Sequence, residues 1–262
     1  MKVTVLGSGT SAGVPMIGCD CPVCTSTNPK NKRRRCSILI EAGGQTIIVD
    51  TGPDFRAQCL DAGVKKLDAV LYTHVHADHV HGIDDIRTLN NAMGKPVQAY
   101  AAAQVFDEIA ARFAYAFGDS LGEYGFWRPS LEQNVVDGPF KVGNVEITPI
   151  LQHHGRNKTW GFRIGDFAYS PDVDFLPDES FAALAGVRTW IVDALRDRKH
   201  PSHAHLDLTL SWIARVKPEL SALIHMNHEV DHDTWMAKLP PGVVVAYDGM
   251  VIDCTTASEQ RD

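Results

Sequence analysis

The chain has 262 residues, of which 44% are hydrophobic and 22% are charged, and its formal net charge is −7. Such a composition is ordinary for a globular protein with a large core. The negative charge argues against a general nucleic-acid binder, which carries a basic face. No low-complexity tract, internal repeat or long linker interrupts the sequence, so we expect one domain over residues 1–262 with a cysteine-rich loop near 19–24.

The N-terminal run MKVTVLGSGT is too short and too interrupted for a signal peptide, and no 18-residue apolar stretch is present. We therefore expect a cytoplasmic protein with no membrane partner. The basic run KNKRRR at residues 30–35 predicts a solvated loop, with a patch that attracts an anionic substrate as the alternative. The sequence carries no signal for oligomeric state, and a homodimer is possible.

The first half of the chain predicts a sheet that leads into a histidine-rich loop. Apolar, β-branched runs predict strands at residues 2–6, 37–42, 46–50 and 67–74. A helix is expected over 53–62, with Gly63 placed to end it. A second helix, with an apolar stripe, is expected over 103–117. The aromatic stretch 113–128 is either a helix end that packs on the body or a lid over a substrate.

The second half alternates strands with helices. Strands are predicted at residues 145–150, 159–164, 167–172, 189–195, 221–226 and within 243–254. Helices are predicted at residues 177–185, 207–216 and near 233–238. Strands in runs, with helices spread between them, predict an α/β fold in which mixed sheets pack together and helices lie outside.

Residues 73–82, THVHADHVHG, crowd four histidines and an aspartate behind an apolar strand. His74 and His76 can turn toward one point, and Asp78 and His79 can serve a second point nearby. Imidazole and carboxylate groups suit zinc, manganese or iron. The alternative is a solvated histidine-rich loop, and the buried strand before the array argues against it.

Later loops offer further metal ligands. His153, His154, Asp172 and His225 each lie at or just beyond the end of a predicted strand, where loops can converge on one cleft. Asp172 can bridge two ions through its two oxygens. The adjacent His153 and His154 leave an ambiguity, and the spacing from Thr148 favours His154.

Cys19, Cys21 and Cys24 lie together in CDCPVC. In a cytoplasmic chain, clustered cysteines indicate a metal before a disulfide. A structural zinc needs a fourth ligand, and this spacing is not the common pair of C-x-x-C knuckles. Three free cysteines are the alternative.

These motifs resemble the metallo-β-lactamase superfamily, whose signature is H-x-H-x-D-H, and the likeness extends along nearly the whole chain. The closest likeness is to the phosphoribosyl 1,2-cyclic phosphate phosphodiesterases of phosphonate degradation. It is carried by GTSAGVP, GCDCPVC, THVHADHVHG, SPD, HLDL, IHMNH and YDGM. The resemblance implies an αββα sandwich of two mixed β-sheets flanked by helices.

The resemblance also implies a site with two divalent ions, manganese or zinc, and a separate structural zinc. One active-site ion would take His74, His76 and His154; the other would take Asp78, His79 and His225, and Asp172 would bridge them. The structural zinc would take Cys19, Cys21, Cys24 and His228.

This ligand set predicts a metal-dependent phosphodiesterase. A hydroxide that bridges two divalent ions would attack phosphorus, so the expected substrate is a phosphoribosyl or nucleoside cyclic phosphate. The leaving oxygen needs a proton, and residues alone do not choose among His200, His203 and His205. The resemblance selects His205, which stands before x-D-L, as the general acid, and we count Asp78 with it among the catalytic residues.

Three other functions remain open. A tRNA 3′-end endonuclease shares the metal motif but usually carries a flexible basic arm, and the negative net charge makes nucleic acid an unfavoured partner. The same ions could hydrolyse a thioester or a lactam. A non-catalytic module would bind nucleotide or zinc without turnover.

Overall fold

The computed structural model describes residues 1–118 and 120–254. The expected domain span of 1–262 thus includes residue 119 and residues 255–262, which lie outside the described part. In the described part of the chain, no helix combines the length and the apolarity that crossing a bilayer requires.

Most strands belong to two large sheets. The first contains β1 (Lys2–Gly7), β2 (Ser37–Ala42), β3 (Gln45–Val49), β4 (Ala69–Leu71), β5 (Val97–Ala101), β8 (Leu131–Val135) and β16 (Val251–Asp253). The second contains β9 (Phe140–Val142), β10 (Val145–His154), β11 (Asn157–Ile164), β12 (Phe167–Ser170), β13 (Thr189–Asp193), β14 (Leu220–Ile224) and β15 (Val243–Val245). A separate hairpin pairs β6 (Leu121–Gly122) with β7 (Gly125–Phe126).

The helices lie between and after these strands. They are α1 (Phe55–Asp61), α2 (Ala77–Val80), α3 (Ile86–Met93), α4 (Ala103–Arg112), α5 (Asp178–Ala183), α6 (Leu206–Val216) and α7 (His232–Lys238). Short 3₁₀ turns are η1 (Pro29–Asn31), η2 (Ile83–Asp85) and η3 (Ala114–Ala116).

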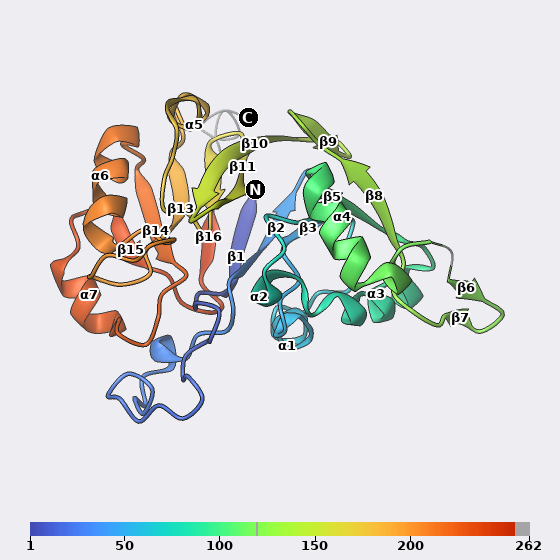
Figure 1. Cartoon of the computed structure of the whole chain (residues 1–262), viewed down its shortest axis with the longest axis horizontal. Coiled ribbons are helices and arrows are strands. Elements are labelled where there is room, and N and C mark those ends of the chain that lie inside the picture. The colour runs from blue at the N-terminus through green and yellow to red at the C-terminus, as the bar shows by residue number, and fades with distance from the viewer. Residues whose placement is uncertain (119, 255–262) are drawn as a thin grey trace.

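The two sheets pack face to face with helices outside them (Figure 1). The first has the strand order β16-β1-β2-β3-β4-β5-β8, and the second has the order β15-β14-β13-β12-β11-β10-β9. In each sheet antiparallel pairs give way to parallel pairs, at β3–β4 and at β12–β13. The expected αββα sandwich of two mixed sheets is confirmed.

Three apolar layers hold this arrangement. Between the sheets, side chains such as Ile38 and Phe162 are buried from both sides. Phe106 packs with the layer that joins the first sheet to its helices, and Trp212 and Trp235 pack with the layer outside the second sheet. Because both outer faces are covered by helices, the strand ends are left for function.

The observed elements differ from the expected ones in three places. The helix expected over 103–117 ends at Arg112, because Phe113 leaves the helical conformation and η3 follows. The stretch 243–254 divides into β15 and β16, which belong to different sheets. The sequence patterns did not predict α2, α3, β5, β8, β9 or the β6–β7 hairpin.

The basic run at residues 30–35 is only partly solvated, and Lys32, Arg33, Arg34 and Arg35 line one pocket, so a patch that attracts an anion stays a prediction. Arg33 is buried and donates to the carbonyl of Val230 at 2.9 Å. Arg34 pairs with Asp61 at 2.7 Å. The run therefore fastens the segment between β1 and β2 to the body of the protein.

Candidate metal centre

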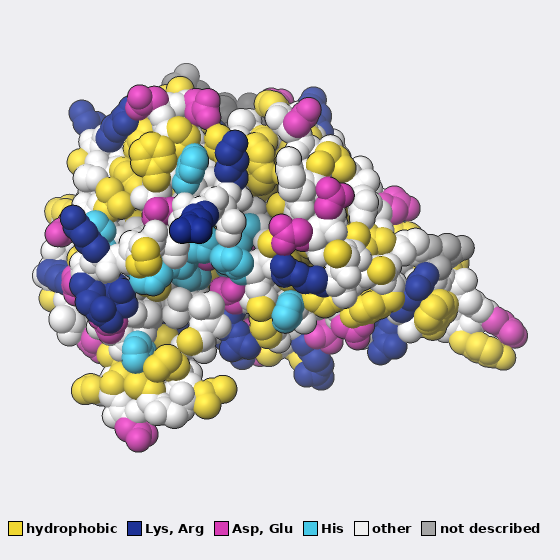
Figure 2. Space-filling view, viewed as in Figure 1, with side chains coloured by type: hydrophobic (Ala, Val, Ile, Leu, Met, Phe, Trp, Pro, Cys, Tyr) yellow, Lys and Arg dark blue, Asp and Glu magenta, His cyan; other side chains and the backbone are white. Residues whose placement is uncertain are grey.

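The expected ligands meet where the strands of both sheets end. β4 leads into His74 and α2, β12 leads into Asp172, and β14 leads into His225, while His154 is the last residue of β10. Ligands in α/β sheets gather beyond the carboxyl ends of parallel strands. Figure 2 shows histidine side chains gathered near the middle of this face.

The side chains form two donor sets that share Asp172. The first set is His74, His76, His154 and Asp172; the second set is Asp78, His79, Asp172 and His225. Within each set the ligand atoms lie within 4.8 Å of one another. Asp172 Oδ2 lies 3.7 Å from His74 Nε2, and its Oδ1 lies 3.3 Å from His225 Nε2. The two oxygens of Asp172 thus face different sets, as a bridging ligand requires.

The donor atoms fit a pair of divalent ions. Asp78 Oδ2, His79 Nε2, Asp172 Oδ1 and both ring nitrogens of His225 are buried without a hydrogen-bond partner. An unpaired buried polar atom costs about 1–3 kcal/mol, so this cluster is unfavourable unless a ligand completes it. Histidine and carboxylate donors suit zinc, manganese or iron.

Backbone strain marks the same place. Asp50, Asp172 and His225 have φ angles of 65°, 44° and 62°, in the left-handed region that non-glycine residues rarely adopt. Each such residue costs on the order of 1–3 kcal/mol, and such strain clusters at functional sites. The fold thus holds two of the seven donors in conformations that only the surrounding structure can maintain.

His154, rather than His153, belongs to the first donor set. The backbone of β10 sends adjacent side chains to opposite faces of the sheet. His153 instead packs against Phe175, with ring centroids 5.4 Å apart. The spacing from Thr148 also favoured His154 over His153, in agreement with this placement.

Asp50, just after β3, is a residue that the sequence analysis missed. Its Oδ2 lies 2.6 Å from His79 Nδ1 and accepts from Thr73 Oγ1 at 2.8 Å. Thr73 Oγ1 lies 2.9 Å from His74 Nδ1. One buried carboxylate therefore orients a histidine of each donor set, directly or through a hydroxyl. The available signal was the apolar strand TIIVD ending in an acid.

His203, rather than His205, lies against the donor sets. Its ring centroid is 4.4 Å from that of His154 and 4.6 Å from that of His225. Burial alone lowers the pKa of His203, but the Asp193 carboxylate, 2.9 Å from its Nδ1, outweighs burial and raises this pKa to about 9. His205 is the N-cap residue of α6 and, within residues 1–118 and 120–254, belongs to none of the donor groups.

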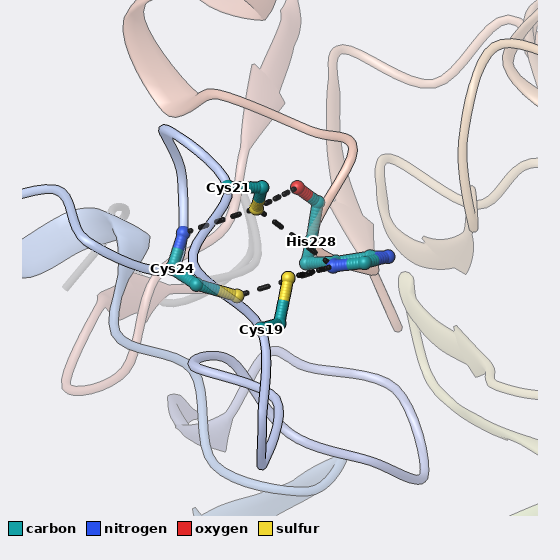
Figure 3. A group of neighbouring side chains, drawn as sticks. All are labelled: Cys19, Cys21, Cys24 and His228. Carbon is teal, nitrogen blue, oxygen red and sulfur yellow. Dashed lines mark hydrogen bonds between the residues drawn. The ribbon is translucent and has the colours of Figure 1, made fainter.

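A separate group joins Cys19, Cys21, Cys24 and His228. The three sulfur atoms and the imidazole point toward one another (Figure 3), and the sulfurs lie 3.1, 3.8 and 3.9 Å from His228 Nδ1. The backbone N–H of Cys24 donates to Cys21 Sγ and lowers the pKa of that thiol. Three sulfurs and one imidazole around one point fit a tetrahedral zinc.

The aromatic segment 113–128 divides into two parts. The β6–β7 hairpin extends away from α2 and the body (Figure 1), and it exposes 94% of Tyr124 and 63% of Trp127. Phe113, at the start of the segment, packs against His81 with ring centroids 5.5 Å apart. The hairpin gives no support to a lid, and residue 119 lies outside the described part.

Comparison with known proteins extends the resemblance. Residues 45–226 match the family model of the beta-lactamase superfamily domain. An octanoyltransferase of Porphyromonas gingivalis is 38% identical over 259 residues, which are 95% of this chain and 51% of the relative. A ribonuclease Z of Bradyrhizobium sp. is 46% identical over 161 residues, which are 60% of this chain and 51% of the relative. The chain thus spans about half the length of these curated relatives.

A solved structure matches at nearly full length. It is a diphosphatase from the PhnP family, 35% identical, with a TM-score of 0.90 over 97% of this chain and 98% of that chain. The family model covers more than half of the chain. The chain therefore belongs to the beta-lactamase superfamily and has the metallo-β-lactamase fold.

Proposed function

We propose that the chain is a metal-dependent hydrolase that opens a small cyclic phosphodiester, such as a phosphoribosyl or nucleoside cyclic phosphate. The observation that carries this proposal is the pair of donor sets that share Asp172 and leave buried donor atoms unpaired. The likeness to a PhnP-family diphosphatase supports phosphorus as the reacting centre.

The residues that would hold the ions follow from the two donor sets. One ion would bind His74, His76 and His154, the other would bind Asp78, His79 and His225, and Asp172 would lie between them. Zinc and manganese both suit these donors. Divalent ions in such a site polarise a phosphoryl group and lower the pKa of water. A structural zinc would bind the three cysteines and His228.

We assign the proton donor to His203 in place of His205. Nδ1 of His203 contacts the Asp193 carboxylate, so Nε2 is the nitrogen that remains available to a substrate. The Asp193 carboxylate raises the pKa of His203, which favours an imidazole that holds a proton and can give it to the leaving oxygen. Asp193 then stabilises the orientation of the ring, as a positioning residue.

The test is a substrate panel with manganese-loaded and zinc-loaded protein. We expect hydrolysis of uridine 2′,3′-cyclic phosphate and bis(4-nitrophenyl) phosphate, loss of both activities with a chelator, and recovery when metal is restored. Asp172→Asn should abolish activity and lower metal content while the protein stays folded. If metal-loaded protein turns over no phosphodiester, the proposal is wrong.

Processing of tRNA 3′ ends is the second candidate, favoured by the likeness to a ribonuclease Z. Two observations weigh against it. The net charge is −7, and the projecting hairpin, residues 121–128, carries one acidic and one basic residue rather than a basic surface. Cleavage of a tRNA precursor without turnover of cyclic phosphates would favour this candidate. A glutathione thioester in the same panel tests acyl hydrolysis.

A further inference from the structure

We propose that Gln152 and Thr159 are positioning residues that act through Asp172. Their side chains hold the backbone that carries this shared aspartate, so that its two oxygens reach both donor sets. The inference rests on the bridging role of Asp172 in the proposed function, but it does not depend on which substrate the protein hydrolyses.

The first step is the conformation that must be maintained. Asp172 is 2% exposed, and its φ angle of 44° lies in the left-handed region. A residue other than glycine keeps such a conformation only when the surrounding structure over-determines it. The antiparallel register of β11 with β12 pairs residues 162–164 with residues 167–169. Asp172 therefore lies beyond the end of this ladder, where pairing with β11 no longer fixes the chain.

The second step is the pair of side chains that takes the place of the ladder. Gln152 on β10 and Thr159 on β11 lie directly opposite each other, and both are fully buried. Gln152 Nε2 donates to the carbonyl of Pro171 at 2.8 Å, and Thr159 Oγ1 donates to the carbonyl of Asp172 at 3.1 Å. Two adjacent carbonyls of the strained segment therefore accept from one cross-strand pair.

The third step is the space in which the glutamine amide lies. A Cβ on Gly161 would lie 2.4 Å from Gln152 Oε1 and 2.7 Å from the carbonyl oxygen of Tyr169 on β12. Gly161 therefore leaves the room that the amide occupies beside β12. Because close-packed interiors leave few voids, the buried amide has little freedom to move away from its acceptor.

The experiment measures metal binding rather than turnover. Manganese is titrated by calorimetry into protein whose active site has been emptied by mild chelation, and the loaded protein is examined by electron paramagnetic resonance. Gln152→Met and Thr159→Val nearly keep the shape of each side chain and remove its donor. We expect each to weaken the binding of active-site manganese by about 10–100-fold, as loss of contacts that orient metal ligands does. The signal of two magnetically coupled ions should weaken as well, because a displaced Asp172 no longer joins them.

Two further variants separate a positioning role from a general loss of stability. Thr159→Ser keeps the hydroxyl, so it should recover most of the affinity and the coupled signal. Gln58→Met on α1 is the matched control, because Gln58 is also buried and its Nε2 also donates to a backbone carbonyl, that of Arg35, at 2.8 Å. It should lower stability as Gln152→Met does and leave manganese binding unchanged.

The inference can fail separately from the proposed function. Wild-type affinity and coupling in both Gln152→Met and Thr159→Val would overturn the inference, and so would equal losses of affinity in Gln152→Met and Gln58→Met. If Gln152→Met does not fold, equal affinities of Thr159→Val and Thr159→Ser overturn it. A wild-type protein that binds the coupled pair of ions but hydrolyses no phosphodiester would refute the proposed function alone.

Discussion

Histidines of the two donor sets are oriented by contacts at their Nδ1 atoms. His79 Nδ1 lies 2.6 Å from a carboxylate oxygen of Asp50, His74 Nδ1 lies 2.9 Å from the hydroxyl of Thr73, and His154 Nδ1 meets a backbone carbonyl. Each contact leaves Nε2 directed at the shared aspartate. Such outer contacts fix the ring and its tautomer before any ligand binds.

His203 has a contact of the same kind at its Nδ1 atom, and this contact distinguishes it from His205. His203 is held by Asp193 against the donor sets, whereas His205 starts α6. We expect His203→Ala to lower kcat on uridine cyclic phosphate by about 10²–10⁴-fold, as loss of a general acid does. We expect His205→Ala to stay within about threefold of wild type, because a position without a cap hydrogen bond contributes little.

Metal analysis completes this comparison. Both variants should keep wild-type metal content, since neither residue belongs to the two donor sets that share Asp172. The loss in His203→Ala should shrink on bis(4-nitrophenyl) phosphate, whose leaving group needs no proton. A large loss in His205→Ala with full activity in His203→Ala would restore the assignment made from sequence.

At the scale of elements, the short helix α2 carries Asp78 and His79 and is clamped by the turn after β3. The N–H of Thr51 donates to the carbonyl of His79, and the N–H of Gly82 donates to the carbonyl of Thr51, both at 2.8 Å. A Cβ on Gly52 would lie 2.1 Å from the carbonyl oxygen of Asp78. Gly52 therefore permits the close approach that holds α2 in place.

Gly52→Ala should disturb this clamp. The added methyl has no space against a backbone oxygen, so we expect the free energy of unfolding to fall by about 1–3 kcal/mol and metal content to fall with it. Denaturant unfolding and metal analysis measure the two effects. Gly138→Ala is the control, because a Cβ there meets nothing within 4 Å. Wild-type stability and metal content in Gly52→Ala would refute the clamp.

Strands and helices whose residues follow a clear hydrophobic pattern could be predicted from the sequence. β2 has the expected bounds of 37–42 because Ile38, Leu39 and Ile40 form a buried, apolar and mostly β-branched run. β8 was missed because it is the edge strand of its sheet and exposes most of its residues, so no alternation marks it. α3 was missed although Gly94, in the left-handed conformation, ends it.

The candidate site divides in the same way. The order of histidines in THVHADHVHG predicts local geometry, since α2 and the loop before it set their directions. Asp50 could not be identified as a support, because its contact with His79 joins residues 29 positions apart. His203 could not be chosen over His205, because a loop has no period to show which side chain faces inward. The contact of His203 Nδ1 with Asp193, the last residue of β13, distinguishes the two in the structure.

At the scale of the whole molecule, the cysteine cluster connects the start of the chain to the metal centre. His228 follows His225 of the second donor set by three residues. Between them, Met226 pairs with the segment after β1: its N–H donates to the carbonyl of Ser8, and its carbonyl accepts from Thr10, both at 3.1 Å. A zinc at the cysteines would therefore hold the loop that presents His225.

Removing one sulfur tests this connection. We expect Cys21→Ala to lose one zinc per chain and at least about 2 kcal/mol of unfolding free energy, because zinc binding at a structural site is folding free energy. In wild-type protein, mild chelation should remove activity first and leave one zinc bound. Cys59→Ala, a core cysteine outside the cluster, controls for loss of a buried sulfur and should keep all metal. Since His225 shares the loop with His228, Cys21→Ala should also weaken the retention of metal at the active site. Unchanged zinc content and stability in Cys21→Ala would refute the connection between the cysteine cluster and the metal centre.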